Sequence, residues 1–410
     1  MSCTVPDPIC SDVAVIGGGI IGLSIALEAQ RAGHRITLID PEPATGATFA
    51  AAGMLAPISE LHYQEEQLLA LTLASAARWP EFAARITAET GMDIGFRATP
   101  TLMLGADAAD RTALEDLQQA RLRLGLEATR ISIREARTME PLLAPNIASA
   151  HLLKLDHQVD PRLAAAAIQK QVLDVAAQRE GRCAQDVLIR ARARELLHQD
   201  PTDTASPVTG ILLDDGREIR APEVVVANGL GALELGGLPQ HLVLPLRPVH
   251  GDILRLRVPE HLRPLTTATV RGVVRGLPVY VVPRNDHTVV IGATSREDTN
   301  AGASAGGVHQ LLRDAQVLLP AVHELELCEV TARARPGTPD NAPLLGRVAA
   351  ANGTVLPGLL IATGFFRHGV LLAPIAARII TELLAGVRDP ALEHFRPDRF
   401  SPARQHQESA

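Results

Sequence analysis

The sequence predicts an α/β protein whose first part is a Rossmann-like, dinucleotide-binding domain. Three observations lead to this prediction. A strand, a glycine-rich turn, a helix and a second strand follow one another within residues 12–40. The length of 410 residues suggests two or three domains. Strand patterns dominate residues 242–294, which predicts a second part of the chain that is rich in β-sheet.

The first βαβ unit carries a nucleotide-binding motif. Residues 12–16 (DVAVI) are expected to form a buried strand, and LSIALEAQRAG is expected to form a helix that ends at Gly33. Between them stands the spacing GxGxxG, which permits a tight turn, admits a pyrophosphate and lets helix and strand pack closely. An acidic residue follows the second strand, eighteen residues after the last glycine, where a ribose-binding carboxylate belongs. The predicted cofactor contacts here are Gly17, Gly19, Ile20, Ile21, Gly22 and Asp40.

A glycine-rich turn without a ligand is the plain alternative, but the strand, helix and carboxylate around the motif favour a dinucleotide. Three features favour FAD over NAD. The fold begins near the N-terminus, the loop 41–57 is long and made of small residues, and glycine-bracketed segments return near the end of the chain. An NAD-dependent dehydrogenase, which more often completes its cofactor domain in one block, remains the alternative from the residues alone.

Further elements follow from apolar spacing and turn residues. Helices are expected over 60–90, 107–124 and 160–181, and a last helix over about 370–385. Strands are expected over 95–105, 186–220, 223–229, 242–294 and 358–364, with a hairpin turn at Asn285-Asp286. The segment 301–307 (AGASAGG) is expected to be a flexible loop.

Composition excludes several classes of protein. The net charge of −7 and the lack of a basic cluster argue against a nucleic-acid partner. The sequence contains no apolar run of eighteen residues, which argues against a membrane span, and no signal-peptide pattern, so we expect a soluble, cytoplasmic protein. The four cysteines form no CxxC pair, so neither a metal site nor a disulfide framework is expected.

Rare residue types narrow the chemistry. Lysine occurs only at Lys154 and Lys170, which argues against an enzyme that needs a Schiff-base lysine. Tyrosine occurs only at Tyr63 and Tyr280, so an aromatic cage is hard to build and a small substrate is favoured. Arg367 stands in the apolar stretch ATGFFRHGVLLAP, where a charged side chain needs an anionic partner.

Five segments together resemble one known family. They are AAAGMLAP (50–57), VYVVPR (279–284), ARPGTPDNAPLLG (334–346), GFFRHGVLLAP (364–374) and FRPDRF (395–400). In this order they resemble the D-amino-acid-oxidase family of FAD enzymes, and most of all its glycine oxidase branch, which is associated with thiamine synthesis.

The resemblance implies two domains. An FAD-binding domain would comprise 10–90, 146–240 and 328–400, and an α+β substrate domain with a mixed, largely antiparallel sheet would comprise 91–145 and 241–327. Residues 1–9 and 401–410 are expected to be flexible tails. The resemblance also implies non-covalent FAD, because residues 334–346 contain no cysteine that could tether the flavin.

The resemblance assigns the substrate site to three residues. Arg335 would clamp the substrate carboxylate with its planar fork, and the neighbouring Arg333 is the alternative. The hydroxyl of Tyr280 would help, although a core tyrosine is the plain interpretation. Arg367 would lie beside the flavin and the substrate. The branch has a histidine where this chain has Pro278.

Further cofactor contacts also come from the resemblance. The loop contacts along FAD would be Ala47, Thr48, Ala52, Gly53 and Met54, and a backbone contact to adenine would come from Ala193. Around the isoalloxazine ring the contacts would be Gly364, Phe365, Phe366, Arg367, His368, Gly369, Val370 and Leu371. His368 stands where we expect an asparagine, and we assign it no catalytic role.

The implied function is oxidation of glycine, and of sarcosine or small D-amino acids, through an imine to the 2-oxo acid and ammonia. Dioxygen would accept the electrons and yield hydrogen peroxide. A D-amino-acid dehydrogenase that uses a quinone and a flavin-binding subunit without turnover are the alternatives, and a homo-oligomer remains open.

Overall fold

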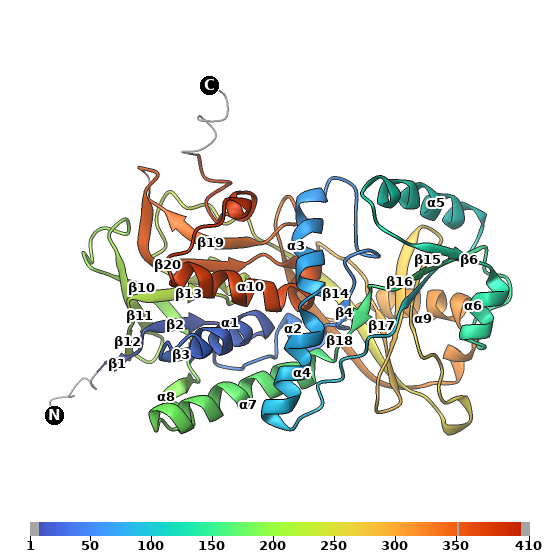
Figure 1. The fold of residues 1–410 in the computed structure, drawn as a ribbon, viewed down its shortest axis with the longest axis horizontal. Coiled ribbons are helices and arrows are strands. Elements are labelled where there is room, and N and C mark those ends of the chain that lie inside the picture. The colour runs from blue at the N-terminus through green and yellow to red at the C-terminus, as the bar shows by residue number, and fades with distance from the viewer. Residues whose placement is uncertain (1–7, 351, 403–410) are drawn as a thin grey trace.

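The computed structural model describes residues 8–350 and 352–402, and the sheets reported below are made of these residues. Two large sheets occupy the two halves of the molecule along its long axis (Figure 1). Short helices and a two-stranded sheet lie between the halves (Figure 1). This arrangement confirms the predicted α/β class with a second part built on a mixed sheet.

The first half is a six-stranded sheet in which only β19 is antiparallel to its neighbour. In spatial order its strands are β19 (Leu344–Ala349), β20 (Val355–Thr363), β13 (Glu223–Val226), β2 (Val13–Ile16), β3 (Ile36–Ile39) and β9 (Leu188–Ile189). Every residue of β2 and β3 is buried, which is typical of a parallel sheet covered on both faces.

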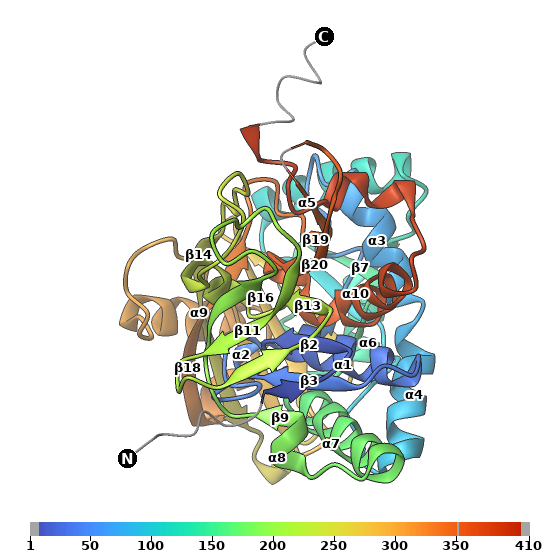
Figure 2. The same cartoon turned by 90° about the vertical axis from the view of Figure 1, so that its left-hand side faces the viewer.

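Helices cover one face of this sheet and a second sheet covers the other. The covering helices are α1 (Ile20–Arg31), α7 (Pro161–Glu180), α8 (Ala184–Val187) and α10 (Gly369–Leu384). The covering sheet consists of β1 (Ile9–Cys10), β12 (Glu218–Arg220), β11 (Val208–Leu213) and β10 (Ala193–His198). Side chains of β2 alternate between the two faces. Val13 and Val15 pack into the core under the helices, and Ala14 and Ile16 pack into the core between the two sheets. Figure 2 shows α7 and α8 below β3 and β9.

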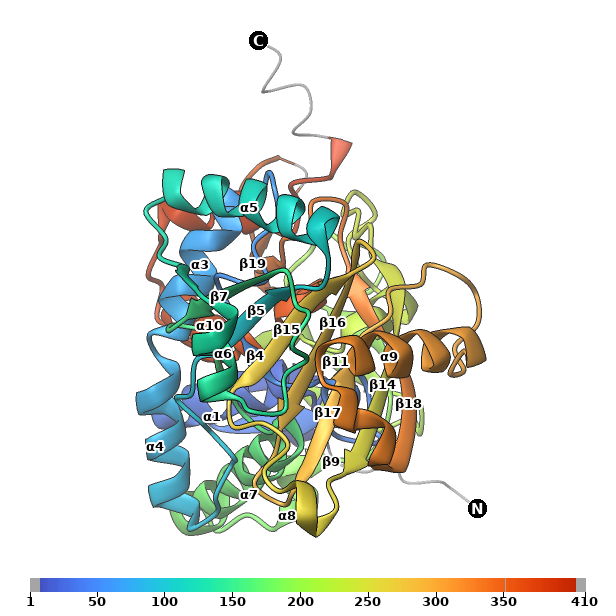
Figure 3. The ribbon, with the colours of Figure 1, turned by 90° about the vertical axis from the view of Figure 1, so that its right-hand side faces the viewer.

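The second half is an eight-stranded sheet in which only β15 and β5 run parallel. Its order is β18 (Glu326–Gly337), β14 (Arg247–Arg257), β17 (Thr288–Gly292), β16 (Leu277–Pro283), β15 (Thr269–Val274), β5 (Thr101–Gly105), β7 (Ser149–Leu153) and β6 (Thr129–Ile131). Around it lie α5 (Ala108–Arg123), α6 (Ile133–Met139) and α9 (Ala305–Leu318) (Figure 3).

Between the halves, the chain forms α2 (Ala47–Ala50), β4 (Met54–Leu55), α3 (Glu66–Ala76), α4 (Trp79–Thr90) and β8 (His157–Gln158). β4 and β8 pair antiparallel, so the loop that follows the first βαβ unit is tied to the segment that precedes α7. Within the described residues, no helix combines the length and the apolar composition that a membrane crossing requires.

The structure differs from the expected helices in two places. The segment expected as one helix over 60–90 is two helices, α3 and α4, and residues 58–65 form turns before them. The expected loop 301–307 contains the start of α9, where Ser304 caps the helix by accepting a hydrogen bond from Gly307 N at 3.1 Å. Gly307 lies so close to the carboxylate of Asp252 that any side chain would overlap it, so this glycine serves close packing.

The sheets also divide the chain differently from the expected domains. β7 and β18 fall in segments that we expected in the FAD-binding domain, yet both belong to the eight-stranded sheet. β18 pairs with β14 along nearly its whole length. The amino-acid composition of a strand does not show which other strand its backbone will pair with, so the sequence did not predict this pairing.

Parts of the expected tails are ordered. Ile9 pairs with Ile219 in β1, and Ser401 accepts a hydrogen bond from Val243 N at 3.1 Å. The rest of the expected tails, residues 1–7 and 403–410, lies outside the described residues.

Trp79, the single tryptophan, provides a test of how α4 is held against α10. Its ring is fully buried, and its Nε1 donates a hydrogen bond to Leu371 O at 2.9 Å. Trp79→Phe removes this bond and leaves a small cavity, so we expect the free energy of unfolding to fall by about 1–3 kcal/mol. Urea denaturation followed by circular dichroism measures the change. A variant as stable as the parent would show that this contact contributes nothing.

Candidate cofactor and substrate site

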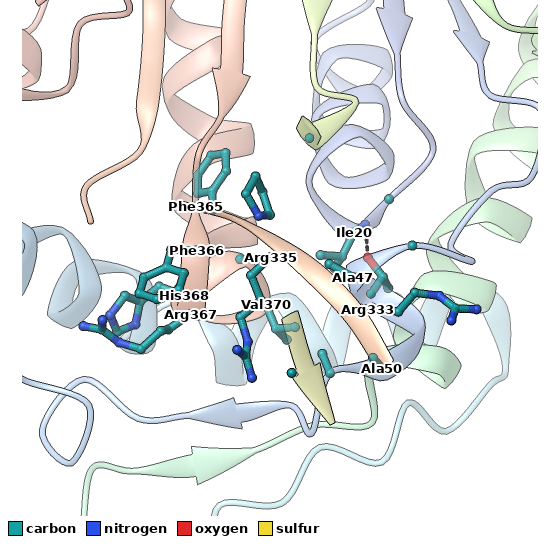
Figure 4. A pocket seen from close by; sticks show the side chains of 18 of the residues that line it. Ile20, Ala47, Ala50, Arg333, Arg335, Phe365, Phe366, Arg367, His368 and Val370 are labelled. Carbon is teal, nitrogen blue, oxygen red and sulfur yellow. Dashed lines mark hydrogen bonds between the residues drawn. The ribbon is translucent and has the colours of Figure 1, made fainter. Parts of the chain in front are cut away.

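A cavity of about 580 Å³ lies between the two sheets and is lined by residues of both. Gly17 and Asp40 line it from the six-stranded sheet, and Tyr280 and Arg335 line it from the eight-stranded sheet. Figure 4 shows Ile20 and Ala47 on one side, Phe366, Arg367 and His368 on the other, and Arg335 between them. Its volume is typical of a site for a small ligand or cofactor.

The glycine motif leaves no room for side chains where the strand turns into α1. Gly17 has φ = 107°, and a Cβ there would lie 2.6 Å from Ala227 O. A Cβ at Gly22 would overlap the carbonyl oxygen of Gly17. The N-cap residue of α1 is Gly19, which has no side chain to accept from the first turn, and that turn carries no acidic residue. The N-terminus of α1 is therefore suited to the pyrophosphate of a dinucleotide.

Asp40 and Thr48 fix the backbone around this helix terminus. The two oxygens of Asp40 accept hydrogen bonds from Gly18 N at 2.6 Å and Glu42 N at 2.8 Å. Thr48 Oγ1 accepts from Ile20 N at 3.0 Å, which is the dashed contact in Figure 4. The carboxylate of Asp40 thus lies at the wall of the cavity beside the glycine turn, where a ribose contact is expected.

Three arginines hold the loop that separates the two sheets. Arg162 Nε donates to Phe49 O at 2.8 Å, and its guanidinium carbon lies 3.4 Å from the centre of the Phe49 ring. Arg255 Nη2 donates to the same carbonyl at 3.2 Å, and Arg284 Nη2 donates to Ala52 O at 2.5 Å. Burial lowers the pKa of Arg284 to about 10, so the side chain stays charged at neutral pH.

The end of the cavity beside the eight-stranded sheet is built around Arg335 and Tyr280. Gly251 on β14 makes room for Arg335, because a Cβ at Gly251 would overlap the guanidinium. Gly292 on β17 makes room for the Tyr280 hydroxyl in the same way. Arg335 donates only to Thr294 O, at 3.3 and 3.4 Å, and the described residues offer it no carboxylate within ion-pair distance.

Burial raises the pKa of Tyr280, so its hydroxyl remains a hydrogen-bond donor at neutral pH. A charged guanidinium and a neutral phenol that line the same cavity form a suitable receptor for one carboxylate. The two residues come from strands β16 and β18 of the same sheet, and β17 and β14 lie between these strands. Gly292 on β17 and Gly251 on β14 leave the space over which the two side chains extend.

Arg367 lines the cavity from the turn Phe366–His368, but its charge is already paired. Its Nη2 lies 2.6 and 2.8 Å from the carboxylate oxygens of Glu65, and its Nε lies 3.4 Å from Glu60 Oε2. We expected the anionic partner of Arg367 to be the flavin site and the substrate. The structure supplies two glutamates instead.

Most of the predicted site residues line the cavity. Four do not: Gly22, Ala193, Gly364 and Leu371. Whether or not a residue lines the cavity, its assignment as a cofactor or substrate contact stays a prediction. Gly22 and Gly364 serve backbone geometry, since Gly22 packs against Gly17 and Gly364 has φ = 74°. Leu371 is buried in the helical core.

The sequence reasoning missed several residues of the site. Glu60, His62 and Arg271 line the cavity, and Glu65 lies directly behind it. The sequence did not indicate Glu60 and Glu65 as site residues, because residues 60–90 were expected to form an ordinary helix. Arg271 carried a usable signal, since it is an arginine in an apolar strand (TVRGVV), which is the same signal that singled out Arg367.

The DAO family model, described as FAD dependent oxidoreductase, matches residues 12–383. The glycine oxidase of Geobacillus kaustophilus is 32% identical over 378 residues, which cover 91% of this chain and 92% of the relative. The bifunctional protein ThiO/ThiG of Trichormus variabilis is 31% identical over 95% of this chain, and the chain spans 55% of that relative's length. The crystal structure of the Geobacillus kaustophilus enzyme matches with a TM-score of 0.82 at 28% identity and covers 95% of this chain and 99% of that one.

The role of Asp40 is open to a direct test. Asp40→Ala removes the acceptor of two backbone N–H groups and the carboxylate at the cavity wall, so we expect FAD to bind at least about tenfold more weakly. Titration of the cofactor-free protein with FAD measures the dissociation constant. Asp12→Ala is the matched control, because Asp12 accepts from Arg35 N at 2.7 Å outside the cavity. Equal losses in both variants would contradict a cofactor role for Asp40.

Proposed function

Because the chain belongs to the DAO family of FAD-dependent oxidoreductases, we propose that it oxidises glycine, and also sarcosine or small D-amino acids. The products are the 2-oxo acid, ammonia (methylamine from sarcosine) and hydrogen peroxide. The observation that supports this proposal best is the pair Arg335–Tyr280 at the wall of the cavity, where a guanidinium without a carboxylate partner faces a site for a small anion.

In this proposal Arg335 binds the substrate carboxylate through its fork of N–H donors, and Tyr280 donates its hydroxyl to the same group. These contacts hold the substrate in one orientation, which lowers the entropy cost of reaching the reactive geometry. The chemistry that FAD would supply in this cavity is acceptance of the α-carbon hydride and delivery of the electrons to dioxygen. The amine loses a proton, and water hydrolyses the resulting imine.

The residues that would hold FAD are those of the glycine turn, Asp40, Thr48 and the loop up to Met54. We infer a non-covalent complex, since the described residues that line the cavity include no cysteine. No residue of the cavity is assigned as a general base. Glu60 is held between two arginines, and burial lowers the pKa of His62 and His368.

Oxygen as acceptor and a role in thiamine synthesis are further parts of this proposal. The role in thiamine synthesis is suggested by the similarity to the ThiO/ThiG protein. A dehydrogenase that passes electrons to a quinone is the second candidate, because neither lysine of the chain lines the cavity and no lysine is therefore placed to assist a reaction with oxygen there.

An anaerobic reduction experiment separates these functions. We expect glycine, and then sarcosine or D-alanine, to bleach the yellow absorption of the purified protein under anaerobic conditions. Admission of air should restore the colour and release hydrogen peroxide. Bleaching without recovery in air would identify a dehydrogenase, and no bleaching by any of the three would contradict amino-acid oxidation.

Arg335→Ala tests the carboxylate clamp. Loss of a buried, charge-assisted contact should raise KM for glycine by about 30-fold or more, while the FAD content stays unchanged. Arg257→Ala is the control, because Arg257 is an exposed arginine of β14 whose ion pair with Glu326 is long, at 3.8 Å. A larger rise in KM for Arg333→Ala than for Arg335→Ala would transfer the role to Arg333.

A further inference from the structure

A second arginine lies beside the proposed carboxylate clamp. Arg271 on β15 is the direct cross-strand partner of Tyr280 on β16, so the two side chains leave the sheet on the same face. Both residues line the cavity. Pro278, two residues before Tyr280, also lines it and offers no polar group. Arg271 therefore supplies a second positive charge at the cavity wall, from the strand next to that of Tyr280.

Glu60 neutralises this second arginine. Its Oε1 contacts Arg271 Nη1, and its Oε2 lies 3.4 Å from Arg367 Nε. The side chains of Arg271 and Glu60 are 9% and 11% exposed, so water screens this contact little. Arg335 differs from both other arginines, because its only described acceptor is the carbonyl oxygen of Thr294.

The charges at this end of the cavity leave room for one anion. The carboxylates of Glu60 and Glu65 pair with Arg271 and Arg367, which leaves the positive charge of Arg335 without a carboxylate partner among the described residues. Histidine adds none at neutral pH, because burial lowers the pKa of the two histidines lining the cavity. A substrate with one carboxylate and a neutral amine, the form from which a hydride is transferred, brings the sum to zero. A second carboxylate would have to displace Glu60 or remain unpaired in a buried site, and both are costly.

We propose that this site selects amino acids with a single carboxylate, and that Glu60 determines the selection by occupying Arg271. The inference rests on the proposed oxidation of glycine and narrows its substrate class. Arg271 could bind a carboxylate of a substrate, but the carboxylate of Glu60 already occupies it. The site therefore accepts a glycine whose N-substituent is apolar and excludes one whose N-substituent carries a second carboxylate.

Sarcosine and iminodiacetate form a matched pair of probes, because they differ only in the carboxylate on the N-substituent. The parent holoenzyme should show a higher kcat/KM for sarcosine. Glu60→Gln keeps the shape but removes the charge, so the ratio of kcat/KM for iminodiacetate over sarcosine should rise by about tenfold or more. Adding Arg271→Met to this variant should abolish the gain. An unchanged ratio in Glu60→Gln, or a parent that prefers iminodiacetate, would overturn the proposal.

Glu65→Gln is the matched control, since it also removes one negative charge but contacts Arg367 and not Arg271. Its ratio should stay within about threefold of the parent's, because a charge change that does not touch the receptor acts weakly. An equal rise in both variants would show that overall charge, rather than Glu60, sets the selection. If Glu60→Gln does not fold, the variant Arg271→Met is tested alone. A ratio of kcat/KM for iminodiacetate over sarcosine that is higher in this variant than in the parent contradicts the proposal.

A binding measurement separates failure of this inference from failure of the proposed function. Acetate and malonate should perturb the visible flavin spectrum of the holoenzyme without turnover. The parent should bind acetate and exclude malonate, and Glu60→Gln should gain affinity for malonate. This outcome supports the selection by charge even if no amino acid reduces the flavin, and malonate binding equally well to the parent contradicts it.

Discussion

The whole site depends on how the loop between Asp40 and the two-stranded sheet is held between the halves of the molecule. Arg162, Arg255 and Arg284 reach its carbonyl oxygens from α7, β14 and the end of β16. A charged donor to a carbonyl oxygen contributes about 1.5–3 kcal/mol, so the three contacts together bind the loop firmly to the rest of the chain. Residues of the loop line the cavity, so the loop forms the wall that connects the contributions of the two sheets.

The two halves contribute different chemistry to the cavity. The six-stranded sheet offers backbone groups at the end of β2 and the N-terminus of α1, which suit a phosphate group because they present N–H groups in fixed positions. The eight-stranded sheet offers the guanidinium groups of Arg335 on β18 and Arg271 on β15. Gly251 and Gly292, on the strands between them, leave the space that Arg335 and Tyr280 occupy. Cofactor and substrate can thus be bound by different mechanisms in one continuous space.

Buried positive charge is the main electrostatic problem of this design. Carbonyl oxygens of the loop accept hydrogen bonds from the buried arginines around it, and glutamates form ion pairs with Arg367 and Arg271. The Arg162 hydrogen bonds lower the pKa of Glu329 to about 2, which shows how strongly these cations act on their neighbours. Arg335 is the exception, because it has no carboxylate partner among the described residues, and its charge is therefore the one that suits an anionic ligand.

The sequence by itself determined the βαβ unit, the glycine turn with Asp40 after it, and the family, and it indicated Arg335, Tyr280 and Arg367, which all line the cavity. These features are local, because they depend on spacing within a few residues or on short motifs. Only the tertiary structure decided that β7 and β18 join the eight-stranded sheet, that α9 begins within a glycine-rich segment, and that Glu60 lies against Arg271. Strand pairing and ion pairs between distant segments depend on backbone register and on the path of turns, and neither quantity is encoded in the periodicity of one segment.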